Sequence, residues 1–305
     1  ASQWLGGMPP PPGVEPNFDN PVNQKPQNIG LHATLLTLVT ICVLMRVYTR
    51  ARLLPTKMGA DDYSCILSYC ISICFTGLMF KAFSKGIGRH MWDTPAAWVP
   101  EALKWFTIAT YTYLLLAAVV KLTILFFYYR LFAAEPKMRY LVVFGLAFVV
   151  CLNGGVFLAN IFSCRPVRRT WDPTVPGQCF NPVILPYMSG VSSSLTDIYV
   201  LLLPIRVIWG LHLDWTRKLK LMAVFGLGTL ACVASLIRLA MTPQLRSSPD
   251  ATWTISNVAI WATIEVNVGI ICASLMLLPA FFNMFFPKLR ARIFLWLETH
   301  TRGGH

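Results

Sequence analysis

Seven long segments of the chain consist almost entirely of apolar residues, and shorter stretches rich in charged residues, proline and glycine separate them. A helix needs roughly 20 mostly apolar residues to cross a hydrocarbon core of about 30 Å. Each segment is long enough, so the pattern predicts an all-α, polytopic membrane protein built as a seven-transmembrane helix bundle. The segments lie at about 30–50, 60–83, 102–132, 138–162, 183–209, 217–242 and 255–286.

Composition and charge support this class and give the helices a direction. The chain is 55% hydrophobic and 13% charged, with a mean hydropathy of +0.57, whereas soluble domains are about 25% charged. Of its 26 lysines and arginines, fifteen lie at one set of helix ends and loops, nine at the other and two inside helices. Basic residues favour the cytoplasmic side. We therefore expect the N-terminus outside and the C-terminus in the cytoplasm, and no nucleic-acid partner.

The predicted helices divide the chain into three parts. Residues 1–29 form a Pro-rich external tail, 30–286 the seven-helix transmembrane domain, and 287–305 a basic amphipathic cytoplasmic tail. The first part has no apolar signal sequence, so we expect the first membrane helix to direct insertion. This tail is either disordered or drapes over the external mouth of the bundle through Trp4, Phe18 and its prolines. We expect a multi-pass integral protein of the plasma membrane or an endomembrane.

Four charged residues lie deep inside the predicted helices, away from their ends: Lys121, Asp197, Arg238 and Glu265. A charge at that depth costs at least about 2.5–3.5 kcal/mol unless it finds a partner or water. One interpretation is that the four pair with one another and hold the helices in register. The other is that Asp197 and Glu265, both expected near the middle of the bilayer, form the floor of a ligand pocket in the outer half. Its wall would comprise Tyr111, Asn160, Arg238 and Trp261.

One long outer loop, residues 163–182, bears on such a pocket. Cys164 and Cys179 lie in it, and an oxidising exterior with a short closed loop favours a disulfide between them. Trp171 would roof the pocket, together with His90 from the loop between the second and third helices. The loop arginines would attract anionic amphiphiles to the mouth or contact lipid headgroups instead: Arg165, Arg168 and Arg169. The other seven cysteines lie in apolar helices, and their spacing predicts no metal site.

Asp61 and Asp62 follow the first inner loop, at the start of the second predicted helix. Carboxylates at this position favour the positive end of the helix dipole. Arg46, Arg50 and Arg52 lie across the same loop. We expect a charge cluster at the inner face rather than a catalytic pair of acids. We call this cluster, the two aspartates with the arginines that bind them, the clasp.

Short motifs occur in one order along nearly the whole chain. They are Pro-Pro-Gly-Val-Glu-Pro-Asn-Phe (11–18), Arg46-x-Tyr48-x-Arg50, Gly59-x-Asp61-Asp62-Tyr63, Gly86-x-Gly88-x-His90, Lys121-Leu-Thr-Ile-Leu-Phe-Phe-Tyr-Tyr-Arg130, Cys164-x-Pro166 with Trp171, Gly177-x-Cys179, Asp197 before Leu203-Pro204, Arg238, and Glu265 followed by Pro279. In these motifs the chain resembles the fungal rhodopsin-like family of integral membrane proteins. That family includes receptor-like proteins implicated in surface sensing by plant-pathogenic fungi, and members of biosynthetic gene clusters. The resemblance implies a seven-helix, receptor-like fold.

Two features separate the chain from better-known seven-helix proteins. No lysine lies between Lys220 and Lys288, so the last helix has none to form a Schiff base with retinal, and we expect no cofactor. The third helix ends in Tyr128-Tyr129-Arg130 instead of the acidic-Arg-aromatic triplet of G-protein-coupled receptors. A cytoplasmic G protein is therefore expected as a partner by fold analogy only.

Three classes of function fit these patterns. The first is a receptor that binds a small lipophilic ligand. The second is a membrane-embedded biosynthetic enzyme, a cyclase or isomerase of a lipophilic metabolite, in which Asp197 or Glu265 acts as general acid or base and His90 reaches the same cavity. The third is a transporter, which the lack of an inverted repeat disfavours. The expected partners are membrane lipid and a small lipophilic or amphiphilic ligand or substrate.

Overall fold

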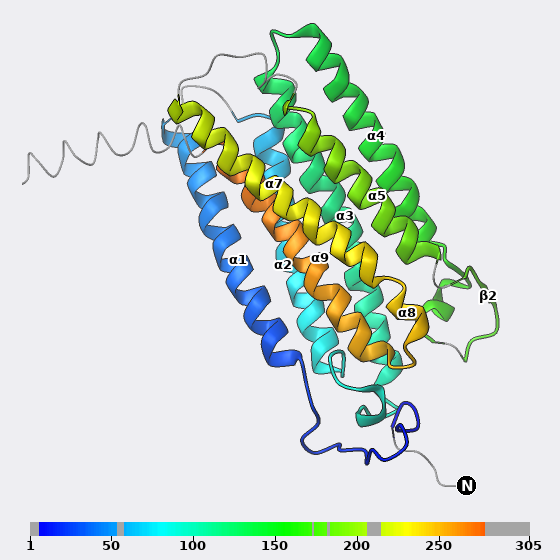
Figure 1. Ribbon diagram of the computed structural model, residues 1–305. Helices are drawn as coiled ribbons and strands as arrows, with labels where there is room; N and C mark the ends of the chain where they lie inside the picture. Colours follow the sequence, from blue (N-terminus) through cyan, green and yellow to red (C-terminus); the bar gives the residue numbers. More distant parts are fainter. Residues whose placement is uncertain (1–5, 54–57, 173, 182–183, 206–214, 278–305) are drawn as a thin grey trace, which may run out of the picture.

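The computed structural model describes residues 6–53, 58–172, 174–181, 184–205 and 215–277, which form a bundle of seven long helices (Figure 1). The long helices are α1 (Lys25–Tyr48), α2 (Ala60–Ser84), α3 (Val99–Leu131), α4 (Pro136–Ile161), α5 (Ile184–Leu202), α7 (Trp215–Met241) and α9 (Ala251–Leu275). The shorter elements are the π-helix η1 (Thr49–Leu53), the 3-10 helices η2 (Met91–Asp93) and η3 (Val167–Thr170), the helix α8 (Gln244–Ser247) and the strands β1 (Cys164–Arg165) and β2 (Gln178–Cys179).

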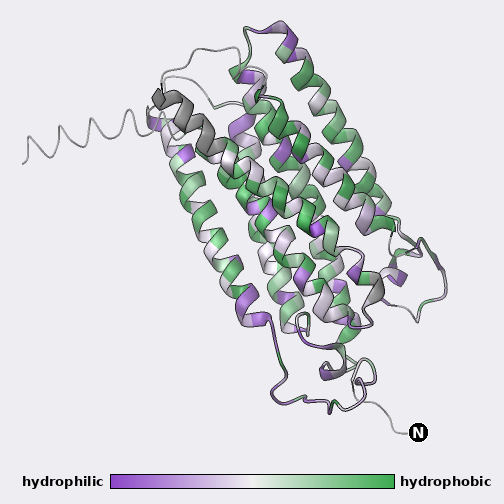
Figure 2. Ribbon diagram, viewed as in Figure 1, coloured by the Kyte–Doolittle hydropathy of each residue, from purple (hydrophilic) through white to green (hydrophobic). Residues whose placement is uncertain are grey.

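Most of these described helices are suited to a membrane. Five are long and apolar enough to cross one: Lys25–Arg52, Ala60–Ser84, Ala96–Leu131, Pro136–Ile161 and Ala251–Leu275. α7 contains a shorter apolar stretch, Phe225–Met241, and α5 carries four serines and Asp197 within its 19 residues. Figure 2 shows hydrophobic residues along the described helices and hydrophilic ones at their ends and at a few positions inside. The chain is a helical, multi-pass membrane protein, as the apolar pattern predicts.

The boundaries of three helices differ from those expected. α9 runs from Ala251 to Leu275, rather than over 255–286, and a turn at residues 276–277 follows it. α1 begins at Lys25, so the N-terminal tail ends at residue 24 rather than 29; Pro26 in the first turn has no N–H to leave unpaired there. α5 ends at Leu202 rather than near 209, and a turn at Leu203-Pro204 follows, because proline lacks an N–H and disfavours the helical conformation in the preceding residue. The expected segments 206–209, 278–286 and 287–305 lie outside the described residues.

α3 is the central helix of the bundle, since it packs against α2, α4, α5 and α9. One hydrophobic cluster joins it to α1, α2 and α9 and includes Phe75 and Leu116. A second cluster joins it to α4 and α5 and includes Leu125 and Val142. Side chains on different faces of α3 therefore reach most of the bundle interior, including the places where charged residues are buried.

The two ends of the bundle are distinct (Figure 1). At one end β1 and β2 pair in antiparallel fashion, with Cys164 opposite Cys179, and a disulfide joins the same two cysteines. We call this the disulfide end; the N-terminal segment also lies there. At the other end, the clasp end, α1 finishes close to the start of α2. The disulfide expected from the sequence is present.

Breaking this disulfide is expected to destabilise the loop and the bundle beside it. The bond joins residues separated by 15 positions, for which the chain-entropy relation gives about 3 kcal/mol. Cys164→Ser and Cys179→Ser should therefore each lower the melting temperature of the purified protein. The double variant should melt no lower than either, because all three remove the same bond. Intact-mass analysis that found both thiols free in the native protein would contradict the bond.

The N-terminal segment lies along the connection between α2 and α3. The Gly7 amide donates to the carbonyl oxygen of Met91 at 3.1 Å, and the Asn17 amide donates to Asp93 Oδ1 at 2.9 Å. The described part of the tail thus packs on the bundle at the disulfide end, as a draped tail would, although Phe18, which was expected to anchor it, is exposed. Trp4 lies outside the described residues.

Arg46 of α1 forms the centre of the clasp. Its Nη2 lies 2.6 Å from Asp61 Oδ2, its Nε donates to Asp62 Oδ1 at 2.9 Å, and its Nη1 donates to the Ala273 carbonyl oxygen of α9 at 2.6 Å. Arg50 contacts the same two carboxylates at 3.3 and 3.0 Å. These charged side chains are no more than 6% exposed. The clasp therefore ties α1, α2 and α9 together.

The membership of the clasp differs from the sequence expectation at two arginines. Arg52 is exposed, and no contact joins it to either aspartate among the described residues. The reason is helical spacing: Arg46 and Arg50 are four residues apart and share one face, whereas Arg52 is two residues further. Arg130, in the last turn of α3, joins instead, with its Nη1 at 3.4 and 3.8 Å from the two carboxylates. The clasp thus also holds α3.

Candidate functional site

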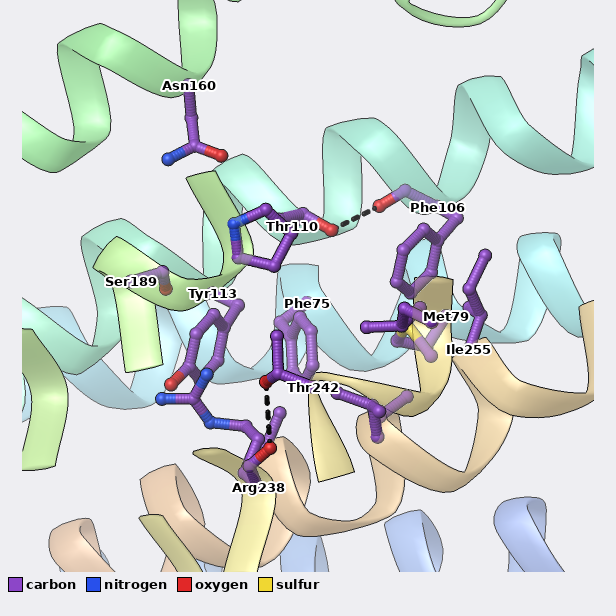
Figure 3. Close-up of a pocket in the computed structure, with 15 residues that line it drawn as sticks. Phe75, Met79, Phe106, Thr110, Tyr113, Asn160, Ser189, Arg238, Thr242 and Ile255 are labelled. Carbon is purple, nitrogen blue, oxygen red and sulfur yellow. Dashed lines mark hydrogen bonds between the residues drawn. The ribbon is translucent and has the colours of Figure 1, made fainter. Parts of the chain in front are cut away.

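A cavity of about 180 Å³ lies in the half of the bundle nearer the disulfide end, among α2, α3, α4, α5, α7, α8 and α9 (Figure 3). Most of its wall is apolar, with aromatic rings from α2 and α3 and aliphatic side chains from α9. A concave, mostly apolar space with a few polar groups is the usual form of a small-molecule site. The lining residues are Phe75, Met79, Phe106, Thr110, Tyr113, Asn160, Pro186, Ser189, Arg238, Thr242, Leu245, Ile255, Val258, Ala259 and Ala262.

Helical spacing explains why two of the helices each give several residues to this wall. Phe106, Thr110 and Tyr113 stand at i, i+4 and i+7 and therefore share one face of α3. Ile255 and Ala262 are likewise seven residues apart on α9. Each helix thus presents one continuous stripe to the cavity.

Arg238 of α7 is the charged side chain at this wall, and Glu265 of α9 is its partner. Arg238 Nε donates to Glu265 Oε2 at 2.9 Å, and neither side chain is more than 5% exposed. The guanidinium carbon lies 5.1 Å from the centroid of the Tyr113 ring, a cation–π contact, and Figure 3 shows the two side chains together at the cavity. Arg238 therefore links α7 to both α9 and α3.

A chain of hydrogen bonds extends from this pair into the bundle. Glu265 Oε1 accepts from the Tyr113 hydroxyl at 3.0 Å and from Ser193 Oγ at 2.6 Å. Lys121 Nζ donates to Ser193 Oγ at 2.7 Å and lies 3.3 Å from Asp197 Oδ1. Ser193 and Asp197 are four residues apart, so one face of α5 meets Lys121 of α3. We call these six side chains the buried network: Tyr113, Lys121, Ser193, Asp197, Arg238 and Glu265.

The buried network holds two cations and two carboxylates in two ion pairs, Lys121 with Asp197 and Arg238 with Glu265. Its net charge is zero with both carboxylates ionised, and pairing is the condition under which buried charges are tolerated. The four residues thus pair with one another, as the first sequence interpretation expects. Among the described residues, Asp197 Oδ2 and Arg238 Nη2 have no hydrogen-bond partner.

The residues proposed from the sequence for a pocket fall into different places. Asn160 and Arg238 line the cavity. Asp197 and Glu265 belong to the buried network and do not line it; Glu265 meets it through Arg238. Tyr111 donates its hydroxyl to the Asn160 carbonyl oxygen at 3.2 Å and so contacts a lining residue without lining the cavity itself. The structure brings Glu265 next to the cavity, behind Arg238 and Tyr113. Asp197 lies further away, linked to Glu265 through Lys121 and Ser193.

The aromatic residues were the hardest to assign from the sequence. Trp171 and Trp261 are half-buried, and neither lines the cavity in the part of the chain described. Tyr113, which was not proposed, does line it. Tyr111 and Tyr113 are two residues apart, about 200° around a helix, so only one can face a given side. The spacing of Tyr113 from Phe106 was the signal that distinguishes them.

His90 has a different environment from the one expected. Its ring is stacked between those of Trp92 and Trp253, with centroids at 4.5 and 4.1 Å. Its Nδ1 lies 2.5 Å from Asp250 Oδ2. His90 therefore fastens the α2–α3 connection to the start of α9, and it is not a lining residue of the cavity. Within the described ranges, no three His, Cys, Asp or Glu side chains gather as they would around a metal ion.

In the loop that the Cys164–Cys179 disulfide closes, which we call the disulfide loop, two arginines bind partners within the loop. Arg168 lies 3.5 Å from Asp172 Oδ2, and Arg169 Nη1 donates to the Val175 carbonyl oxygen at 2.9 Å. The Thr174 hydroxyl donates to Asp172 Oδ1 and, with Arg168, holds the pKa of that carboxyl below its ordinary value. Asp172 therefore stays ionised beside Arg168, which reduces the positive potential expected at the loop.

Comparison with known proteins gives a match over most of the chain. The fungal rhodopsin domain family matches residues 45–284. A SAT4 family membrane protein of Emericella nidulans is 31% identical over 74% of this chain and 57% of its own length. No solved structure matches the chain significantly.

Other relatives carry names of two kinds. "Fugralins biosynthesis cluster protein 2" of Gibberella zeae is 29% identical over 86% of this chain and 67% of its own length. "Receptor GIN3" of Arthrobotrys oligospora is 22% identical over 91% of this chain and 67% of its own length. The chain thus spans between 57% and 67% of these curated relatives. The similar proteins include both a receptor and a biosynthesis cluster protein.

Proposed function

Since the chain belongs to the fungal rhodopsin domain family, we propose that it is a seven-transmembrane, receptor-like protein that binds a small lipophilic ligand in the cavity beside Arg238. One observation carries this proposal: Arg238 belongs both to the cavity wall and to the buried network. A molecule in the cavity therefore touches a charged group that is bonded to α9 and stacked on α3. The similarity to a protein named as a receptor supports the same class.

The proposed topology has the disulfide end outside and the clasp end in the cytoplasm. A disulfide persists in an oxidising exterior, and the clasp gathers Arg46, Arg50 and Arg130 at the other end, in keeping with the positive-inside bias. α5 and α7 would be the remaining two spans. The serines of α5 are buried in the bundle, so the polarity of this helix does not require contact with lipid.

The proposed response begins with a change at Arg238. A ligand shifts a conformational equilibrium only as far as it binds the two states with different affinity. Glu265 accepts hydrogen bonds from α3, α5 and α7 at once, so a ligand that moves Arg238 alters the junction of four helices. α7 runs from Arg238 towards the clasp end and would carry this movement to the cytoplasmic side. A G protein as receiver remains a proposal by fold analogy.

A membrane-embedded biosynthetic enzyme is the second candidate, and the similarity to a biosynthesis cluster protein favours it. In that case Asp197 or Glu265 would serve as general acid or base. Arg238 stands between Glu265 and the cavity, and Tyr113 donates to Glu265 while lining the cavity. A proton would therefore pass between Glu265 and a substrate by way of the Tyr113 hydroxyl.

Cysteine accessibility separates these two functions. Ala259 lines the cavity and is 5% exposed, whereas Ala109 of α3 is fully buried and does not line it. For a receptor with an outward opening, we expect Ala259→Cys to react with a membrane-impermeant methanethiosulfonate added outside intact cells, and Ala109→Cys to stay unreacted. Parental protein with its native cysteines gives the background.

Two results would contradict the receptor proposal. In the first, Ala259→Cys reacts no faster than Ala109→Cys with the external reagent. In the second, it reacts only with a lipid-soluble maleimide, which indicates a cavity reached through the membrane and supports the enzyme instead.

A further inference from the structure

The charge at the cavity wall is already neutralised by the protein. Arg238 is the one charged side chain among the described residues that line the cavity, and Glu265 holds it at 2.9 Å. The second pair, Lys121 with Asp197, leaves no surplus cation nearby. A ligand carboxylate beside Arg238 would thus bring a third anion next to two cations, in a setting where unpaired charge is strongly disfavoured.

Arg238 Nη2 is the buried donor of the wall that has no hydrogen-bond partner among the described residues, whereas three hydroxyl hydrogens of the wall are already used. The hydroxyl of Thr110 donates to the Phe106 carbonyl oxygen at 3.0 Å, and that of Thr242 donates to the Arg238 carbonyl oxygen at 3.0 Å. The Tyr113 hydroxyl donates to Glu265. What these groups present to the cavity is oxygen lone pairs, which accept from a ligand hydroxyl and repel a carboxylate.

The size of the cavity restricts its occupant as well. An apolar cavity of about 150 Å³ holds one benzene molecule in an engineered protein. The cavity of about 180 Å³ found here is somewhat larger, so it admits a molecule of the size of benzene with a small substituent. The aromatic and aliphatic lining suits such a molecule.

We propose that the cavity selects a small uncharged lipophile, the size of a substituted benzene, and rejects its carboxylate counterpart because Glu265 already neutralises Arg238. This inference rests on the proposed ligand site and names the class of ligand for it. It departs from the anionic amphiphile that the loop arginines suggested from the sequence. The loop arginines set the potential at the mouth, whereas the pair at Arg238 sets the charge that the site accepts.

Two probes of nearly equal size test the selection by charge. 2-Phenylethanol and phenylacetate are added to the full-length protein in lipid nanodiscs, and binding is followed by saturation-transfer difference NMR. We expect 2-phenylethanol to bind with a dissociation constant on the order of 1 mM, as ligands of this size do. Phenylacetate should bind at least about tenfold more weakly, which corresponds to a difference of about 1.4 kcal/mol in binding free energy.

Cavity-filling variants show whether the signal comes from this site. Ala259→Phe and Ala262→Phe each place a ring in the cavity, since both alanines line it, and either should remove the 2-phenylethanol signal that remains after lipid partitioning is subtracted. Two separate variants are used so that poor folding of one does not decide the result.

The sharpest prediction is a reversal of selectivity. Glu265→Gln keeps the side-chain size and frees the charge of Arg238, so phenylacetate should now bind at least about tenfold more tightly than 2-phenylethanol. The double variant Arg238→Gln/Glu265→Gln removes both charges and should again bind 2-phenylethanol more tightly than phenylacetate. If Glu265→Gln folds poorly, the double variant still tests whether the selectivity depends on these two charges.

The outcomes distinguish this inference from the ligand site itself. Wild-type preference for phenylacetate, blocked by Ala259→Phe, would overturn the selection by charge and leave the ligand site standing. Equal binding of both probes, or a preference unchanged in both Glu265 variants, would also overturn it. Binding of neither probe, or binding that both cavity-filling variants leave intact, would overturn the inference and count against the ligand site as well.

Discussion

Glu265→Ala is expected to lower the free energy of unfolding by about 3–5 kcal/mol, the range observed when one partner of a buried ion pair is removed. The Tyr113 hydroxyl, Ser193 Oγ and Arg238 Nε all lose their acceptor at once. The measurement is thermal and denaturant unfolding of the protein in nanodiscs. Thr229→Ala serves as the matched control, because Thr229 is exposed on α7 and should change stability by less than about 0.5 kcal/mol.

A double variant separates the cost of an unpaired charge from the value of the pair. Arg238→Met/Glu265→Met leaves no charge unpaired, and replacing a buried pair by apolar side chains is often close to neutral. We expect it to recover most of the stability lost in Glu265→Ala while abolishing the ligand response. If Glu265→Ala unfolds like the control, the pair with Arg238 does not hold these helices together.

Arg46→Met should be comparably severe at the opposite end of the bundle, again by about 3–5 kcal/mol. Two buried carboxylates and the Ala273 carbonyl oxygen lose a donor, and Arg50 is left as the buried cation beside both acids. Arg52→Met removes the same charge from an exposed arginine six residues along the chain and should have little effect. The two variants are compared by melting temperature and by the amount of protein in the membrane.

The outcome that would contradict this role of the clasp is equal stability of the two variants. In that case the contacts of Arg46 would contribute no more than an exposed arginine does, and the close approach of α1, α2 and α9 would have to come from apolar packing alone.

The apolar pattern was enough to predict the class of the fold, because membrane helices reveal themselves through length and hydropathy. It placed α4 within a few residues, and the expected charge cluster at the first inner loop is present with Arg46 and Arg50 but without Arg52. The end of α5 was harder, because the apolar run continues past Pro204 while the helix stops at Leu202. The helix therefore ends where Pro204 interrupts it, and hydropathy does not indicate this boundary.

Contacts between helices could not be read from local spacing. Lys121 pairs with Asp197 and Arg238 with Glu265, yet the sequence equally allowed the opposite pairing. Arg130 joins the clasp because α3 ends beside the start of α2, a fact of tertiary packing. The same holds for the cavity: its position depends on how several helices meet, and Glu265 contacts it through Arg238 and Tyr113.

A cryo-EM map of the protein purified from fungal membranes tests the proposed ligand site most directly. We expect density that does not belong to the protein between Arg238 and Ala259, in a cavity that opens towards the disulfide end. A cavity filled by the protein's own side chains, or bound molecules found only on the lipid-facing surface, would contradict a ligand site there.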